Sequence, residues 1–247
     1  MNNENILVSD SAVKYNPYTF YDDCIHELSE IKFVYNLCRS KIKKSLIINV
    51  GSQSGSFCLF AKFIKHEFLA LEADPTSHNC LKENLEINNI TNVRTKNTLI
   101  LDRVGIETFN VFPTHTGLNH AGSEFIRIEK KYSKQISMPC ETLDSLLNSS
   151  KNYLPIYLLI IDCEGAELSI LQGAKELINE NRPLIFLEWN EQNLKQFGHS
   201  TSELEELLES LNYKKFVTLG ENRLYYRRMG LGLLYARILK YFKFFEN

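Results

Sequence analysis

The sequence lacks several features that mark common classes of protein. The 247 residues carry 28 Lys and Arg against 30 Asp and Glu, a formal net charge of −2. No general excess of positive charge therefore points to nucleic acid as a partner. No stretch approaches the roughly 20 consecutive apolar residues of a membrane-spanning helix. We therefore expect a globular protein that does not bind nucleic acid.

The six cysteines lack the spacing of a zinc or redox site. No two of them form a Cys-x-x-Cys pair, and several stand within apolar runs. Thiols distributed in this way are typical of a reducing compartment. The first residues, MNNENILVSDSAVKYNPY, also lack the basic and long apolar segments of a secretory signal. The expected location is the cytoplasm.

One glycine is absent where a dinucleotide-binding loop would need it. Residues 47–55 read IINVGSQSG, so an apolar run ends at Gly51, and Gly55 follows four residues later. In the loop G-x-G-x-x-G the middle glycine lets the backbone approach a pyrophosphate, because any Cβ would collide there. Gln53 occupies that place in this chain. The loop disfavours a dinucleotide and suits a cofactor without pyrophosphate, such as S-adenosylmethionine.

From residue 46 onward the chain alternates short apolar runs with amphipathic segments. The segments predicted as strands are LIINV, EFLALEA, NVRTKNTLI, YLLIID and PLIFLEW. The segments with helical periodicity are SFCLFAKFI, DPTSHNCLKENLEINN, AELSILQGAKELINE and STSELEELLESL, the second beginning with Asp74 as N-cap and Pro75. This alternation predicts an α/β fold, a mostly parallel sheet with helices on both faces. Ligands of such sheets bind beyond the carboxyl ends of the strands.

Two segments lie outside the alternating unit. Residues 1–45 are polar at first and then amphipathic and basic, and residues 227–247 carry five Lys or Arg and one Glu. We expect an N-terminal extension over 1–45, a domain over 46–226 and a basic amphipathic helix over 227–247.

The last segment has seven large apolar side chains on one helical face. They are Leu231, Leu234, Tyr235, Ile238, Leu239, Phe242 and Phe245, with Arg237, Lys240 and Lys243 elsewhere on the helix. Such a helix packs on its own domain or on a second subunit, which would make a homodimer. Its basic and aromatic character also suits an anionic membrane surface, so a peripheral membrane contact remains the alternative.

An acidic side chain follows the second predicted strand. Glu72 stands twenty-one residues after Gly51. A carboxylate at this place accepts hydrogen bonds from the ribose hydroxyls of a bound nucleoside. A glycine turn after a buried strand also occurs for structural reasons alone. Glu72 at the neighbouring strand end favours the interpretation as a cofactor site.

A second group of acids follows the strand YLLIID. Asp162 ends that strand, Glu164 lies on the following turn, and Gly165 permits a sharp change of direction. Glu188 repeats the arrangement after the next strand, and Glu167, in a first helical turn, suits the helix dipole. Acids at the mouths of buried strands could transfer protons, or could hold Mg²⁺ or Ca²⁺ through their oxygens.

Five segments, taken in order and spacing, resemble the FkbM family of methyltransferases that use S-adenosylmethionine. The segments are NVGSQSG, LEADP, ETLDSLL, IIDCEGAELSILQGA and RPLIFLEWN. The resemblance runs from about residue 46 to residue 226, and its most specific part is Asp-x-Glu-Gly-Ala-Glu. It implies a class I methyltransferase fold and O-methylation of a hydroxyl, often on a sugar of a glycan, glycolipid or natural product.

The resemblance also assigns residues to roles. It implies that Gly51, Gly55 and Glu72 fall on cofactor positions and that Asp162 and Glu164 belong to the acidic signature near the transfer site. We also predict that Asn49, Ser54 and Asp162 bind the cofactor. The chain departs from the family where Asn49 replaces Asp and where Ser52-Gln53 replaces Ala-Asn. The Asn49 amide can form hydrogen bonds but lacks the charge that favours a cationic cofactor.

Methyl transfer to a hydroxyl needs little from the protein beyond positioning and a base. The sulfonium is already activated, so in-line positioning contributes most, and a general base must take the hydroxyl proton. The candidate bases are Asp162, Glu164, Glu188 and the loop histidines His115 and His120. One alternative is a non-catalytic cofactor-binding or interaction protein in which Asn49 and Gln53 are substitutions that accompanied a loss of activity. The other, an NAD-dependent dehydrogenase, is opposed by Gln53 and the acidic turn.

Overall fold

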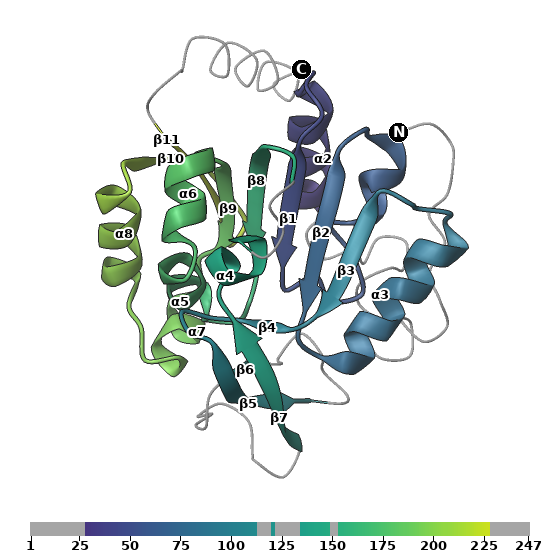
Figure 1. The fold of residues 1–247 in the computed structure, drawn as a ribbon. Helices are drawn as coiled ribbons and strands as arrows, with labels where there is room; N and C mark the ends of the chain where they lie inside the picture. The colour runs from purple at the N-terminus through teal and green to yellow at the C-terminus, as the bar shows by residue number, and fades with distance from the viewer. Residues whose placement is uncertain (1–27, 113–119, 122–133, 149–152, 228–247) are drawn as a thin grey trace.

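The computed structural model describes residues 28–112, 120–121, 134–148 and 153–227. These residues form a seven-stranded sheet covered by helices and a separate four-stranded sheet (Figure 1). The predicted α/β fold with a mostly parallel sheet is confirmed. The predicted C-terminal helix lies outside the described residues from residue 228 onward.

The larger sheet has the strand order β10-β11-β9-β8-β1-β2-β3. Its strands are β1 (Leu46–Val50), β2 (Glu67–Glu72), β3 (Val93–Asn97), β8 (Ile156–Ile161), β9 (Leu184–Glu188), β10 (Tyr213–Leu219) and β11 (Asn222–Arg227). The strands β3, β2, β1, β8 and β9 run parallel, whereas β11 is antiparallel to both β9 and β10. The chain order reverses at β1, which pairs with β2 on one side and β8 on the other. A ligand crevice is expected at such a point.

Helices bury both faces of this sheet, which explains why its central strands are continuously apolar. Alternate strand residues face two separate cores, so Ile47 belongs to one core and Ile48 to the other. The core of Ile47 is covered by α2 (Leu28–Ser40), the 3₁₀ helix η1 (Leu59–Phe63) and α3 (Pro75–Ile87). The core of Ile48 is covered by α4 (Leu143–Asn148), α5 (Glu167–Gln172), α6 (Lys175–Asn181), α7 (Glu191–Gln196) and α8 (Thr201–Ser210).

The smaller sheet lies beyond the carboxyl ends of β1, β2 and β3 (Figure 1). Its order is β4-β7-β5-β6, with β4 (Leu99–Ile100), β5 (Gly105–Val111), β6 (His120–Ala121) and β7 (Lys134–Glu141). The segment NVRTKNTLI, predicted as one strand, therefore serves two sheets. The break falls at Thr98, whose N–H donates to the Glu72 carbonyl and whose hydroxyl donates to Glu141.

Two predicted helices differ from the observed ones. The segment SFCLFAKFI forms only the short 3₁₀ helix η1. Three consecutive side chains of η1, those of Leu59, Phe60 and Ala61, are buried, whereas a predicted α-helix would bury residues on one face. The segment AELSILQGAKELINE divides into α5 and α6 at Gly173. A Cβ on Gly173 would lie 2.3 Å from the Leu101 carbonyl oxygen, so the break occurs where another part of the backbone approaches closely.

The start of α3 agrees with the sequence prediction. Asp74 caps the helix by accepting from the backbone N–H groups of Thr76 and Ser77, and Pro75 occupies the first helical position. Among the described residues no helix is both long enough and apolar enough to cross a membrane.

Candidate active site

The glycine after β1 lies where two loops meet. Gly51 has φ +78°, and a Cβ on it would stand 1.8 Å from the carbonyl oxygen of Asp162 and 2.9 Å from the sulfur of Cys163. The loop after β1 therefore passes in direct contact with the loop after β8. Only glycine satisfies both the backbone conformation and the close approach.

Glu72 joins the loop after β1 to the loop after β2. One carboxylate oxygen accepts from the Gln53 N–H at 2.7 Å, and the other accepts from the Asp74 N–H at 2.8 Å. Burial raises the pKa of Glu72 to about 7, and the charge of Asp74 adds to the rise while the two N–H donors oppose it. Gln53, at φ +44°, turns its N–H toward Glu72. The residue that replaces the middle glycine thus orients the proposed ribose-binding carboxylate.

A cavity at the ends of β1, β2 and β8 brings together four of the predicted site residues. Its lining includes Gly51, Glu72, Asp162 and Glu164. Phe109, from β5, also lines the cavity, so the smaller sheet contributes to the same site. Because parallel strands place their carboxyl ends at one edge of the sheet, these four residues meet although they come from segments far apart in the chain.

The other predicted cofactor residues lie beneath the loop and not in the cavity lining. The side chain of Asn49 is fully buried, and its amide oxygen accepts from the Cys58 thiol at 3.3 Å. Ser54 is buried, and its carbonyl oxygen accepts from Asn84 on α3. Gly55 packs against α3, since a Cβ there would lie 2.8 Å from Leu81. The role of these three residues in cofactor binding stays a prediction.

Three carboxylates gather beside the cavity. Asp162, Glu164 and Glu188 each offer an oxygen, and these oxygens lie within 4.8 Å of one another. Glu188 is buried at the end of β9, while the other two are half-buried on the turn after β8. Such carboxylates repel one another unless a proton or a cation lies between them. The cluster can therefore accept a proton, accept hydrogen bonds from hydroxyl groups or hold a cation.

The turn that carries Glu164 is held from two sides. Glu164 has φ +52°, and the side-chain amide of Asn193 on α7 donates to its carboxylate at 2.7 Å. A Cβ on Gly165 would stand 2.2 Å from the Asn193 carbonyl oxygen, so the turn packs directly on α7. On the other side, one oxygen of Glu167 accepts from the N–H groups of Cys163 and Gly165.

Glu167 therefore does more than favour the helix dipole. It is almost fully buried, and burial raises its pKa to about 7 although backbone N–H groups oppose the rise. The pKa of the neighbouring Cys163 is also raised. Burial raises the pKa of its thiol well above the usual value, with the charges of Glu167 and Asp162 adding to the effect. The raised pKa favours the neutral thiol of Cys163 over the nucleophilic thiolate.

Sequence reasoning missed three residues of this site. Thr98 and Phe109 line the cavity, and Asn193 orients Glu164. Thr98 fell inside the single strand predicted for NVRTKNTLI, so its place at a strand end was not visible in the sequence. Asn193 carried no signal, because its bond to Glu164 spans 29 residues. Of the candidate histidines, His115 lies outside the described residues, and His120 belongs to β6.

The strand order, the glycine loop and the acidic strand end define a class I methyltransferase, a class that uses S-adenosylmethionine. The comparison with known families gives a more particular assignment. Residues 49–215 match the Methyltransferase FkbM domain. Because the match covers more than half of the chain, the chain belongs to the FkbM methyltransferase family. The resemblance inferred from the sequence is confirmed. No curated protein matches the chain.

Several solved methyltransferase structures are similar to this chain. An FkbM methyltransferase from Methylobacillus flagellatus KT is 15% identical, with 78% of this chain and 47% of that chain covered and a TM-score of 0.49. This chain thus spans about half the length of that protein. A ribosomal protein L11 methylase from Lactobacillus delbrueckii subsp. bulgaricus is 13% identical, with 84% and 80% covered and a TM-score of 0.48. A Streptococcus mutans methyltransferase, SMU.1697c, solved in complex with SAH, is 12% identical, with 79% and 94% covered and a TM-score of 0.46.

Proposed function

We propose that this protein transfers a methyl group from S-adenosylmethionine to a hydroxyl group on a sugar of a glycan, glycolipid or natural product. The main support is the cluster of Asp162, Glu164 and Glu188 beside the cofactor cavity. Carboxylates in such a group accept hydrogen bonds from neighbouring hydroxyls and can take a proton from one of them. A sugar presents several hydroxyls to be held in this way.

The residues at the cavity fit the cofactor. Gly51, Glu72 and Asp162 line the same cavity, and Glu72 offers remaining acceptor capacity to ribose hydroxyls. S-adenosylmethionine supplies an activated methyl group when bound. The chain's contribution is to hold the acceptor oxygen in line and to keep a carboxylate within reach of its proton.

Asp162 is our first candidate for the base. It lines the cavity directly, as Glu164 also does, whereas Glu188 is not part of the lining. The Asn193 amide donates to the Glu164 carboxylate, which suits Glu164 for positioning. The proton of the acceptor hydroxyl would pass to the carboxylate of Asp162 as the oxygen attacks. Glu164 and Glu188 would bind the other hydroxyls and fix the orientation of the sugar.

The test is methyl transfer to nucleotide sugars and glycolipid extracts, measured with labelled S-adenosylmethionine. Asp162→Asn should lower turnover by about a hundredfold or more, the range for a positioned base, while S-adenosylhomocysteine still binds. Glu83→Gln, on the exposed surface of α3, is the matched control and should leave turnover unchanged. If Asp162→Asn and Glu164→Gln both keep full turnover, neither is the base, and His115 becomes the next residue to test.

A divalent cation is the alternative use of the same cluster. Three oxygens within 4.8 Å of one another suit Mg²⁺ or Ca²⁺. Turnover that a chelator abolishes and Mg²⁺ or Ca²⁺ restores would favour this alternative over simple base catalysis. Binding of S-adenosylhomocysteine without transfer to any acceptor would instead favour the non-catalytic alternative.

A further inference from the structure

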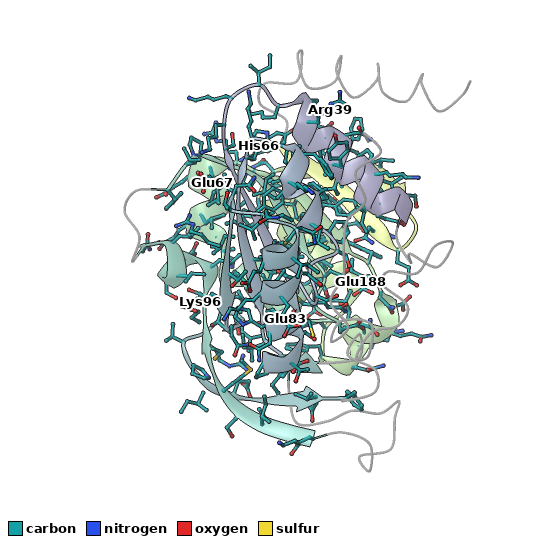
Figure 2. The ribbon with its side chains drawn as sticks, turned by 90° about the vertical axis from the view of Figure 1, so that its right-hand side faces the viewer. Arg39, His66, Glu67, Glu83, Lys96 and Glu188 are labelled. Atoms are coloured by element: carbon teal, nitrogen blue, oxygen red, sulfur yellow. The ribbon has the colours of Figure 1, made fainter. Side chains whose placement is uncertain are left out.

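A compact basic surface lies at the amino-terminal ends of the strands. It consists of six side chains, Arg39, Lys41, Lys43, Lys44, Lys62 and Lys65, of which Lys41 is half-buried and the other five are exposed. In Figure 2, Arg39, His66 and Glu67 lie toward the upper end of the molecule, and Glu188 lies in the lower half. The basic surface is therefore at the opposite end of the sheet from the candidate active site.

His66 holds together the two segments that carry these charges. One segment runs from the end of α2 into β1, and the other runs from the end of η1 into β2. His66 is buried; its Nδ1 accepts from the Ser45 N–H at 3.1 Å, and its Nε2–H donates to the Cys38 carbonyl oxygen at 2.9 Å. Because both ring nitrogens are used, the two basic segments are fixed side by side.

Little negative charge offsets these cations. The only acid within residues 39–45 and 62–67 is Glu67, which pairs with Lys44 at 2.6 Å. Arg39, Lys43 and Lys65 form no ion pair with any residue in the described parts of the chain. The surface thus has a formal excess of five positive charges in a chain whose net charge is −2.

An exposed aliphatic side chain stands among these cations. Ile42 lies between Lys41 and Lys43 and is 69% exposed. Cations that surround an aliphatic group suit a lipid headgroup layer, where the cations meet anionic phosphates and the aliphatic group enters the acyl boundary. A nucleic-acid surface would instead favour exposed aromatic side chains for stacking on bases.

We propose that this basic surface, centred on Ile42, docks the protein on an anionic phospholipid bilayer. The point where the described chain ends supports the same partner. Strand β11 runs antiparallel to β9 and ends at Arg227. The chain therefore leaves the sheet at the amino-terminal end of the parallel strands, the same end as the basic surface. The residues that follow include Arg228, Arg237, Lys240 and Lys243. These residues lie outside the described part of the chain, and their positive charge would favour the same anionic lipid.

The test is sedimentation of the full-length protein with vesicles of phosphatidylcholine alone or mixed with phosphatidylglycerol. The protein should bind only the anionic vesicles, and added salt should weaken the binding. Lys43→Glu combined with Lys65→Glu should weaken it by about tenfold or more, since each basic residue near the surface contributes measurably. Ile42→Ser should weaken it severalfold without changing its salt dependence.

Matched variants show whether the basic surface, other exposed lysines or the residues after Arg227 are responsible for vesicle binding. Lys82→Glu combined with Lys175→Glu makes the same charge change on exposed positions of α3 and α6 and should leave binding unchanged. Unchanged affinity for S-adenosylhomocysteine shows that each variant is folded. The proposal is wrong if the Lys43 and Lys65 variant binds normally while Lys240→Glu with Lys243→Glu abolishes binding. It is also wrong if the protein ignores anionic vesicles or prefers a short DNA duplex to them.

Discussion

At the scale of single residues, Gly51 shows how little space the cofactor loop allows. Gly51→Ala would bring a Cβ to 1.8 Å from the Asp162 carbonyl oxygen and would also strain a φ of +78°. We expect a loss of about 3 kcal/mol in the free energy of unfolding, together with loss of S-adenosylhomocysteine binding. Chemical denaturation and calorimetric titration measure the two effects.

A second glycine, Gly198, allows the cost of backbone strain to be measured without a steric clash. Gly198 has φ +82°, but no heavy atom outside its immediate neighbours lies within 4 Å of the place that a Cβ would take, so Gly198→Ala adds only the backbone strain. Its expected cost is about 1 kcal/mol, with cofactor binding intact. Equal losses in the two variants would show that the contact with the loop of Asp162 is unimportant.

Glu72 should make cofactor binding depend on pH. The ionised carboxylate is the better acceptor for ribose hydroxyls, and the pKa of about 7 means that it is largely protonated at pH 6. Affinity for S-adenosylhomocysteine should therefore rise by up to about tenfold between pH 6 and pH 8. Calorimetric titration at several pH values gives the profile.

Glu72→Gln provides the control for this pH dependence. The variant cannot ionise at residue 72, so its affinity should be lower than that of the wild type at pH 8 and should be nearly independent of pH. A profile that keeps its slope in the variant would assign the titration to another group. An unchanged affinity at pH 8 would remove Glu72 from the cofactor site.

At the scale of elements, the turn between β8 and α5 is held by the buried side chain of Glu167. Both N–H bonds to Glu167 end on one oxygen, so Glu167→Gln can keep them and remove only the ionisation. The folded-state pKa of about 7 lies above the ordinary value of 4.5, because burial disfavours the charge. The stability contribution of this group is therefore complete below about pH 4.5 and is lost as the pH rises through about 7.

The pH dependence of this stability contribution gives a prediction for Glu167→Gln. Between pH 4.5 and pH 8 the variant should gain up to about 3 kcal/mol in unfolding free energy relative to the wild type. Urea denaturation across the pH range measures the difference, with Glu86→Gln on the exposed surface of α3 as control. Parallel curves for the wild type and Glu167→Gln would mean that Glu167 does not titrate in this range.

At the scale of the whole molecule, the two ends of the sheet carry different tasks. The candidate active site lies at the carboxyl ends of the parallel strands, and the basic surface lies at their amino ends. If the protein docks through the basic surface, its transfer site faces away from the bilayer. An acceptor hydroxyl would then belong to a soluble sugar or to the distal part of a glycan.

Separation of the two ends predicts weak coupling between lipid and cofactor. Anionic vesicles at saturation should change the affinity for S-adenosylhomocysteine by less than about twofold, since no described cavity residue belongs to the basic surface. Titration of the cofactor product with and without vesicles measures the coupling. A change of about tenfold or more would show that docking alters the active site.

The sequence alone determined the α/β class and placed four charged or glycine residues of the cavity lining. Strand-length apolar runs marked the buried strands, and parallel strands place their carboxyl ends at one edge of a sheet. Gly51, Glu72, Asp162 and Glu164 therefore meet at one cavity, as the order of the runs indicated. These features depend on local patterns and on a general rule of connection, so no knowledge of particular contacts was needed.

Only the tertiary structure decided how these residues are held. The Gln53 N–H bonds to Glu72, and Asn193 bonds to Glu164, across 19 and 29 residues of chain. The break of a predicted strand at Thr98 likewise depends on its bond to Glu141 in the smaller sheet. Such contacts depend on the positions that distant segments take when the two cores pack. Burial, which raises the pKa values of Glu72 and Glu167, has the same origin and leaves no local pattern in the sequence.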